Sequence, residues 1–133
     1  MNLLIQEHLD GCAVACLAMV TGTTYGEALK RLHNVDHIPE EGSAWTSNEA
    51  LLEALKGSGF EVLVYTPRRL VELGTSILVV RYLIGVTHYM HVVVWDADRQ
   101  TVLDPFPNGR PRPLYYYEDN LCLVFEIKRK LLH

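Results

Sequence analysis

A cysteine near the N-terminus stands where the sequence predicts the first turn of a helix. Asp10 is expected to cap a helix that begins near Gly11 or Cys12 and continues as an apolar stripe. Unpaired N–H groups at a helix N-terminus favour the thiolate, which is the nucleophilic form of cysteine. Cys12 is therefore the candidate nucleophile. Cys16, one turn further into the apolar helix, is expected to be a small core residue.

A thiolate that attacks a carbonyl group also needs hydrogen-bond donors for the developing oxyanion. The backbone N–H of Cys12 could supply one donor. The side-chain amide of Gln6, six residues upstream, could supply the other if an extended segment passes beside the start of the helix. Gln6 thus becomes a candidate only through its spacing from Cys12.

The segment THYMHVVVWDADRQTVLDP offers a general base and a group to orient it. His91 begins one predicted strand and Asp104 ends the next, so a hairpin of this length can bring them side by side. Asp104 could then hold the imidazole tautomer, as in a Cys-His-carboxylate triad. The alternative is that Asp104-Pro105 forms an ordinary strand end and turn.

Two histidines compete for the role of base. His88 and His91 are three residues apart, so on one strand they would face opposite sides of a sheet. We favour His91, because it is continuous with the strand residues VVVW, whereas His88 falls in the expected turn.

Helical patterns come first along the chain and strand patterns come later. This order predicts an α+β fold, with N-terminal helices packed on a C-terminal antiparallel sheet, in a single domain that spans residues 1–133. Gly22 is expected to end the first helix. Two further helices are expected, which start at Thr23 or Thr24 and at Thr46 or Ser47, and residues 66–74 suggest a short helical turn. The expected segments are helices 24–33 and 47–59 and strands 60–65, 77–84, 91–97, 100–104 and 121–127.

Composition narrows the classes of partner. The chain has 133 residues, of which 49% are hydrophobic, and a formal charge of -4, so nucleic acid is an unexpected partner. Residues 76–95 are very apolar but rich in β-branched side chains, which favours two buried strands over a membrane span. Three cysteines and no recognisable signal peptide predict a cytoplasmic protein with reduced thiols.

The combination of these motifs resembles the papain-like cysteine peptidases. Within them it is most similar to the bacteriocin-processing peptidases that cleave double-glycine leaders, and to their stand-alone relatives. The resemblance rests on Gln6, on DGCAVACLAM (residues 10–19), on HVVVWD from His91, and on Asp104-Pro105. The segments GTTYGEAL and AWTSNEALLEALKGSGFEV also resemble the second and third helices of that family, so the similarity covers nearly the whole chain.

This resemblance implies a papain-like fold and a cysteine peptidase that hydrolyses a peptide or isopeptide bond. Cys12 would be the nucleophile, His91 the base, Asp104 its orienting partner and Gln6 the second oxyanion donor. Deamidation, transamidation or removal of a conjugated modifier would use the same residues. The family usually has Asp-Cys-Gly where this chain has Asp-Gly-Cys. A second hypothesis is accordingly a catalytically inactive peptide-binding or partner-binding module, or an inhibitor or effector from a mobile element.

Other interpretations of the same residues stay open. Cys12 could be a buried structural residue. The spacing of His8, Cys12 and Cys16 suits a helical metal site, but His8 precedes the expected cap, so no metal or other cofactor is expected. Trp45 could line a substrate cleft or anchor its loop. The expected partner is a peptide or protein substrate, and the sequence does not indicate an oligomeric state.

Overall fold

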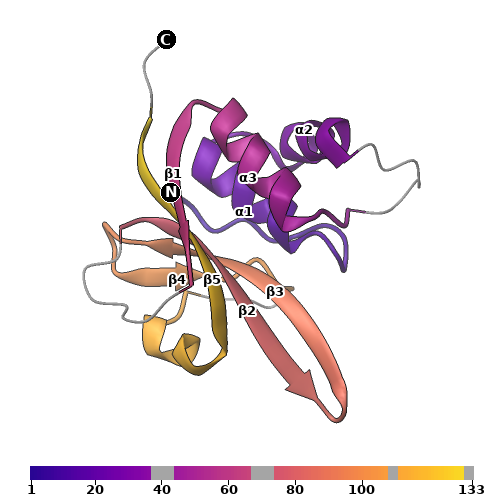
Figure 1. The fold of residues 1–133 in the computed structure, drawn as a ribbon, viewed down its shortest axis with the longest axis vertical. Coiled ribbons are helices and arrows are strands. Elements are labelled where there is room, and N and C mark those ends of the chain that lie inside the picture. Colours follow the sequence, from indigo (N-terminus) through magenta and orange to yellow (C-terminus); the bar gives the residue numbers. More distant parts are fainter. Residues whose placement is uncertain (37–43, 67–73, 108–110, 131–133) are drawn as a thin grey trace.

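A computed structural model describes residues 1–36, 44–66, 74–107 and 111–130. Within these ranges the chain forms three α-helices followed by a five-stranded sheet (Figure 1). Two short 3-10 turns, η1 and η2, precede the last strand. The elements are α1 (Cys12–Thr21), α2 (Tyr25–Asp36), α3 (Asn48–Gly57), β1 (Phe60–Tyr65), β2 (Ser76–Ile84), β3 (Thr87–Asp96), β4 (Thr101–Leu103), η1 (Leu114–Tyr116), η2 (Glu118–Asn120) and β5 (Leu121–Lys130).

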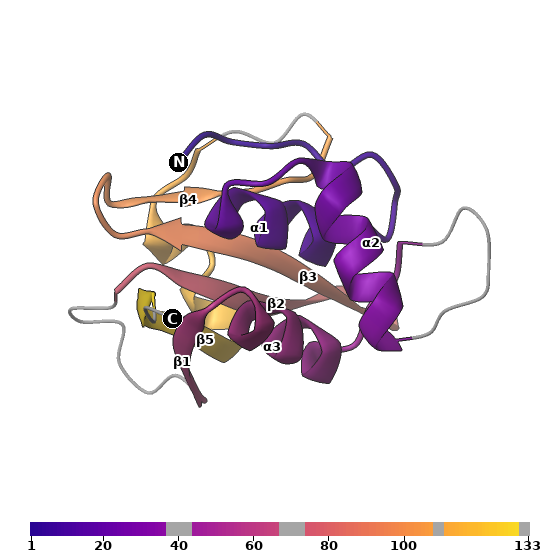
Figure 2. The same cartoon turned by 90° about the horizontal axis from the view of Figure 1, so that it is seen from above.

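The sheet is antiparallel throughout its described strands, in the order β1-β5-β2-β3-β4. The three helices cover one face of it, with α1 against β3 and α3 against β1 (Figure 2). The η1 and η2 turns lie on the opposite side. The predicted α+β class, with helices on an antiparallel sheet, is therefore confirmed.

Both faces of the central strands are buried. Ile77 and Val79 of β2 pack under the helices, whereas Leu78 and Val80 join a second cluster around Tyr117 on the other face. Because strands buried on both faces need apolar residues at successive positions, this packing explains the apolar residues 77–80 and 92–95, whereas residues 85–90 between them are exposed. Among the described helices none is both long and apolar enough to cross a membrane alone, although α1 and α2 pass that test together as a sharply bent pair.

Several predicted helix ends are confirmed. Gly22 ends α1 in the left-handed conformation, with φ 71°. The hydroxyl of Thr24 accepts a hydrogen bond from the Glu27 N–H, and that of Ser47 accepts one from the Ala50 N–H, both at 3.1 Å. These side chains satisfy N–H groups that the first helical turns leave without a backbone partner.

The expected cap at Asp10 is wrong. Gly11 is the N-cap residue of α1, and no side chain caps this helix. The Asp10 carboxylate instead accepts a hydrogen bond from the backbone N–H of Ala44, at 3.1 Å. This contact ties the start of α1 to the segment before α3, so a tertiary interaction replaces the local cap.

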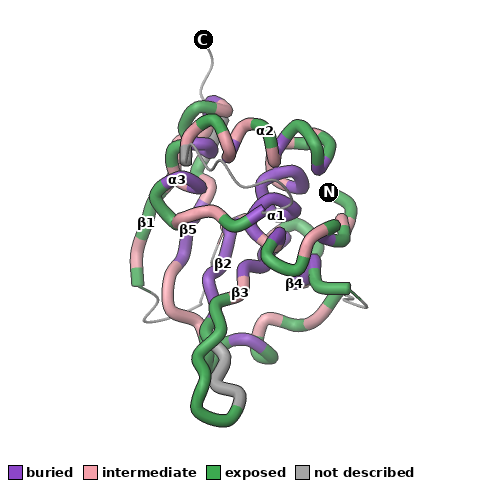
Figure 3. The backbone as a smooth tube through the Cα atoms, turned by 90° about the vertical axis from the view of Figure 1, so that its right-hand side faces the viewer, coloured by how far each residue is buried: buried purple, intermediate pink, exposed green. Residues whose placement is uncertain are grey.

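The hairpin of β2 and β3 is longer than the sequence suggested. β3 begins at Thr87 rather than at His91, because Gly85 (φ 63°) allows a two-residue turn between Ile84 and Thr87. The hairpin projects beyond the helical layer, and its described outer part is exposed (Figure 3). β5 likewise continues past Ile127, and the helical turn expected over residues 66–74 falls almost entirely outside the described residues.

Candidate active site

Cys12 is the first residue of α1, a helix whose middle is buried and whose ends are partly exposed. Residues 13–19 are all buried, whereas Cys12 is of intermediate exposure and lines a cavity. The first α-helical hydrogen bond runs from the Ala15 N–H to the carbonyl of Gly11, at 3.1 Å. The N–H groups of Cys12 and Ala13 precede that bond, so they are the groups whose dipoles favour a thiolate at this position.

The glycine before Cys12 has a steric cause. A Cβ atom at Gly11 would lie 2.1 Å from the phenolic oxygen of Tyr25 and 3.2 Å from the carbonyl oxygen of His8. Tyr25 is buried, and its hydroxyl shares a hydrogen bond of 2.8 Å with Nδ1 of His8. The Asp-Gly-Cys order is thus explained by close packing of the first turn of α1 against α2.

His91 and Asp104 lie side by side, as the hairpin register predicts. β3 pairs with β4 from Val94 opposite Leu103, which brings the residues after β4 alongside His91. Nε2 of His91 is 2.7 Å from Oδ1 of Asp104, and the two side chains are each only 13% exposed. Because Nε2 is bonded to Asp104, Nδ1 is the ring nitrogen that can interact with Cys12.

Electrostatic interactions join Cys12 to this pair. Burial alone would lower the pKa of His91, but hydrogen bonds with Asp104 and Cys12, together with the charges of both, outweigh burial and raise that pKa to about 9. Burial alone would likewise raise the pKa of Asp104. Its hydrogen bond with His91 and the charge of that imidazolium, with further donors, outweigh burial and lower it. The arrangement therefore favours the imidazolium form of His91 beside the Asp104 carboxylate.

Two further donors hold the Asp104 carboxylate. The hydroxyl of the buried Tyr117 donates to Oδ2 at 2.8 Å, and the backbone N–H of Phe106 donates to Oδ1 at 3.0 Å. The Phe106 ring also meets the His91 ring edge-on, at 5.9 Å between centroids. Sequence reasoning missed both residues. The signal for Tyr117 was the run of three tyrosines, since a buried tyrosine hydroxyl usually finds a hydrogen-bond partner.

Gln6 lies near these residues, but its amide is already engaged. Its backbone N–H donates to the carbonyl of Pro105 at 2.8 Å, which places it beside the segment that follows Asp104. Its side-chain Nε2 donates to the carbonyls of His8 and Leu9, both at 2.9 Å, and its buried Oε1 has no hydrogen-bond partner among the described residues. In this conformation Gln6 stabilises the turn before α1 rather than presenting a donor to Cys12.

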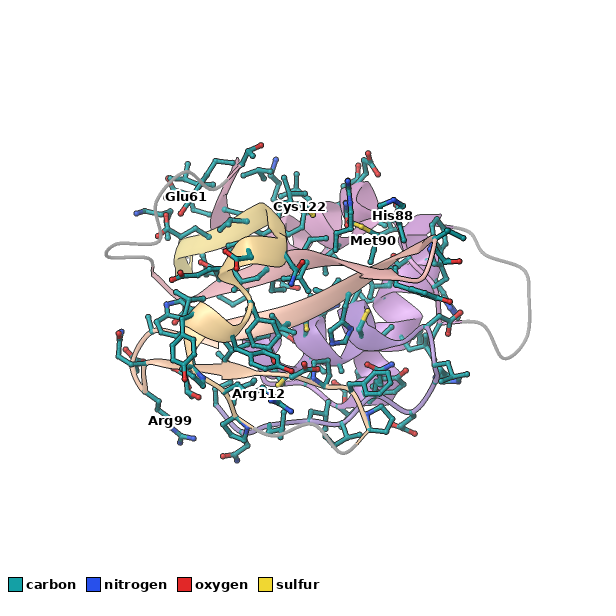
Figure 4. All side chains as sticks on the ribbon, turned by 90° about the horizontal axis from the view of Figure 1, so that it is seen from below. Glu61, His88, Met90, Arg99, Arg112 and Cys122 are labelled. Atoms are coloured by element: carbon teal, nitrogen blue, oxygen red, sulfur yellow. The ribbon has the colours of Figure 1, made fainter. Side chains whose placement is uncertain are left out.

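The two histidines of β3 line different cavities. His91 borders the cavity that contains Cys12, whereas His88 borders a smaller one with Arg81 and Cys122. His88 also lies within β3 rather than in a turn. Figure 4 shows it on the projecting hairpin with Met90. His91 is thus the histidine that lies beside the thiol and a carboxylate.

The cavity beside Cys12 has a volume of about 1240 Å³ and lies between the helical layer and the sheet. Cys12, His91 and Asp104 all contribute to its wall. Trp45, for which a cleft position and a loop anchor were both open, is half exposed and lines it, and Tyr89 and Met90 of β3 line it as well. A space of this size and mainly apolar lining can accommodate several residues of a peptide.

The described residues offer no cluster of three or more potential metal ligands. His8 and Cys16, which were considered as metal ligands together with Cys12, have other contacts. Nδ1 of His8 is bonded to Tyr25, and the buried Cys16 thiol donates to the carbonyl of Val92 at 3.3 Å. Burial, followed by the nearby negative charges of Cys12 and Asp104, raises the pKa of Cys16 well above its ordinary value. Cys16 is therefore a buried core residue, as predicted.

Comparison with known proteins adds no assignment to this geometry. The protein-family models give no match to the chain, and no curated protein matches it either. The thiol, the imidazole and the carboxylate that line one cavity are therefore the features that indicate a function.

Proposed function

We propose that this chain is a papain-like cysteine peptidase that hydrolyses a peptide or isopeptide bond through an acyl-enzyme on Cys12. The observation that carries the proposal is that Cys12, His91 and Asp104 line one cavity large enough for a peptide, with His91 hydrogen-bonded to Asp104 at 2.7 Å. Each of the three side chains has the partner that its role requires.

The reaction follows from this arrangement. His91 holds the proton of the Cys12 thiol, and the thiolate attacks the carbonyl carbon of the substrate. The imidazolium then passes its proton to the leaving nitrogen as the C–N bond breaks, which leaves a thioester on Cys12. Water, deprotonated by His91, attacks the thioester and releases the acid. Asp104 keeps the ring orientation through both steps, and the N–H groups that open α1 are the nearest donors for the oxyanion.

The same residues would support deamidation or removal of a conjugated modifier, and the expected setting is the cytoplasm with a peptide or protein substrate. One observation favours the second candidate function, an inactive peptide-binding or effector module. Both hydrogens of the Gln6 amide are used by backbone carbonyls, so the second oxyanion donor is not presented.

Alkylation separates the two functions. Cys12 should react with iodoacetamide near pH 6 at least about tenfold faster than Cys122 of the same chain, because only Cys12 has an imidazolium partner and burial raises the pKa of Cys122. The His91→Ala variant should lose this advantage. Rates for each thiol are read by peptide mass spectrometry. An unreactive Cys12, or a Cys12 alkylation rate unchanged in His91→Ala, would contradict the proposed peptidase and favour the binding module. A reactive Cys12 justifies a screen of peptide mixtures for new termini.

A further inference from the structure

Arg112 is fixed at the edge of the same cavity. It lines the wall that contains Cys12 and His91. Its backbone exchanges two hydrogen bonds with Val102 of β4, at 2.6 and 2.9 Å, and its carbonyl accepts a third from the hydroxyl of Thr101, at 3.3 Å. Because β4 leads directly into Asp104, Arg112 is held by the same hairpin that holds the His91–Asp104 pair.

The guanidinium of Arg112 is positioned by an aromatic ring rather than by an acid. It lies 4.4 Å from the centroid of the Tyr116 ring, which also lines the cavity. The ion pairs among the described residues involve other side chains, so no described carboxylate lies within 4.0 Å of Arg112. Stacking orients a guanidinium while leaving its in-plane N–H groups available to a ligand.

The charges around the cavity are unevenly distributed. Asp10 and Glu49 line it on the helical side, and Arg112 is the single arginine or lysine among its described lining residues. The Asp104 carboxylate is occupied by His91 and Tyr117. A negatively charged group on a bound chain would therefore be attracted to the Arg112 side and repelled by the helical side.

We propose that Arg112, backed by Tyr116, forms a substrate subsite for a carboxylate close to the bond that Cys12 attacks. The carboxylate is that of an aspartate or glutamate side chain or of a chain terminus, both of which fit the planar fork of a guanidinium. This inference rests on the proposed function, because it assigns substrate selectivity to the same cavity.

Three matched electrophiles test the subsite without a known substrate. They are chloroacetyl-Gly-Glu amide, chloroacetyl-Gly-Gln amide and chloroacetyl-Gly-Gln with a free C-terminal carboxylate. In each case the Cys12 thiolate displaces chloride, so an S–C bond forms as the C–Cl bond breaks. Second-order rates of Cys12 modification are measured by mass spectrometry at low salt, in the native chain and in Arg112→Gln, Arg112→Lys and Arg99→Gln.

We expect at least one carboxylate reagent to react about tenfold faster than the neutral amide, as a half-exposed charge-assisted pair allows. Arg112→Gln should abolish this ratio, and Arg112→Lys should keep part of it. Arg99→Gln is the matched control, because Arg99 is 59% exposed at the turn after β3, apart from Arg112 (Figure 4). Preference for the glutamate amide alone would assign the subsite to an acidic side chain, and preference for the free acid alone would assign it to a chain terminus.

Equal rates for the three reagents in the native chain would overturn the subsite, as would a preference that survives Arg112→Gln. In both cases rapid reaction of Cys12 with the neutral reagent would leave the proposed peptidase intact. If Cys12 reacts no faster than Cys122 with any of the three reagents, the proposed peptidase fails and the subsite fails with it. The rate with the neutral reagent also checks that each Arg112 variant keeps its fold.

Discussion

Removal of the Tyr117 hydroxyl should leave the Asp104 carboxylate with one hydrogen bond fewer and so lower the stability of the folded chain. This hydroxyl is buried and donates to Oδ2 of Asp104 at 2.8 Å. A hydrogen bond to a charged acceptor contributes about 1.5 to 3 kcal/mol, and the ring of phenylalanine keeps the packing. The Tyr117→Phe variant should therefore lose about 2 kcal/mol of unfolding free energy at pH 7.

The loss should depend on pH in a defined direction. Asp104 has a lowered pKa, so its interactions stabilise the folded chain above the unfolded value of about 3.9 and are lost as the pH falls through its folded pKa. Because Tyr117 is one of the donors that lower this pKa, the difference between the native chain and Tyr117→Phe should be constant from pH 7 to about 4 and narrow below that.

Urea unfolding, followed by circular dichroism across this range, measures the difference. Tyr116→Phe is the matched control, because the neighbouring Tyr116 is half exposed and no described residue accepts a hydrogen bond from its hydroxyl. The reasoning is refuted if Tyr117→Phe costs no more than Tyr116→Phe at pH 7. It is also refuted if the cost stays the same below pH 4, because a packing defect would not titrate.

Three further predictions concern the surroundings of Cys12. Gly11→Ala should cost about 1 to 3 kcal/mol of unfolding free energy, because its Cβ would overlap the Tyr25 hydroxyl. In a double-mutant cycle, adding Tyr25→Phe should recover part of that loss, and additive costs would contradict the proposed overlap. In NMR titrations the His91 ring should stay protonated to about pH 9, and Asp104→Asn should lower the pKa of His91; a midpoint near 6.5 in the native chain would contradict the coupling. Cys16 should resist iodoacetamide at pH 8 until urea unfolds the chain, and labelling of the folded chain would show that it is less protected than its burial indicates.

Local patterns were sufficient wherever local interactions decide the structure. The strand segments and the helix caps at Thr24 and Ser47 could be predicted from neighbouring residues. The pairing of His91 with Asp104 was also predictable, because the turn between β3 and β4 is short. The carboxylate of Asp96 accepts the N–H groups of the two residues that follow Ala97 in that turn, and this fixes the register.

The rest depends on tertiary contacts that neither a helix pattern nor a short hairpin turn determines. Asp10 satisfies every local rule for a helix cap, yet its carboxylate bonds to Ala44, 34 residues away. Tyr117 reaches Asp104 only because the η1 and η2 turns pack behind the sheet. Arg112 lies in a segment of prolines and glycine that suggested no regular structure, but it pairs with Val102. Neither a periodic pattern nor the adjacent residues in the sequence indicate any of these contacts.

The alignment of Cys12 with His91 depends on two hydrogen bonds to backbone carbonyls that no sequence motif encodes. Upstream of Cys12, the Gln6 N–H bonds to the carbonyl of Pro105 and ties the N-terminal segment to the chain just after Asp104. Downstream, the Cys16 thiol bonds to the carbonyl of Val92, next to His91. Cys12, the proposed nucleophile, is thus held between contacts to the segments that carry His91 and Asp104. Gln6 is necessary to this arrangement through its backbone, and its amide stabilises the turn that leads into α1. In this structure, the residue expected to donate to the oxyanion instead helps to hold the segment that leads to the proposed nucleophile.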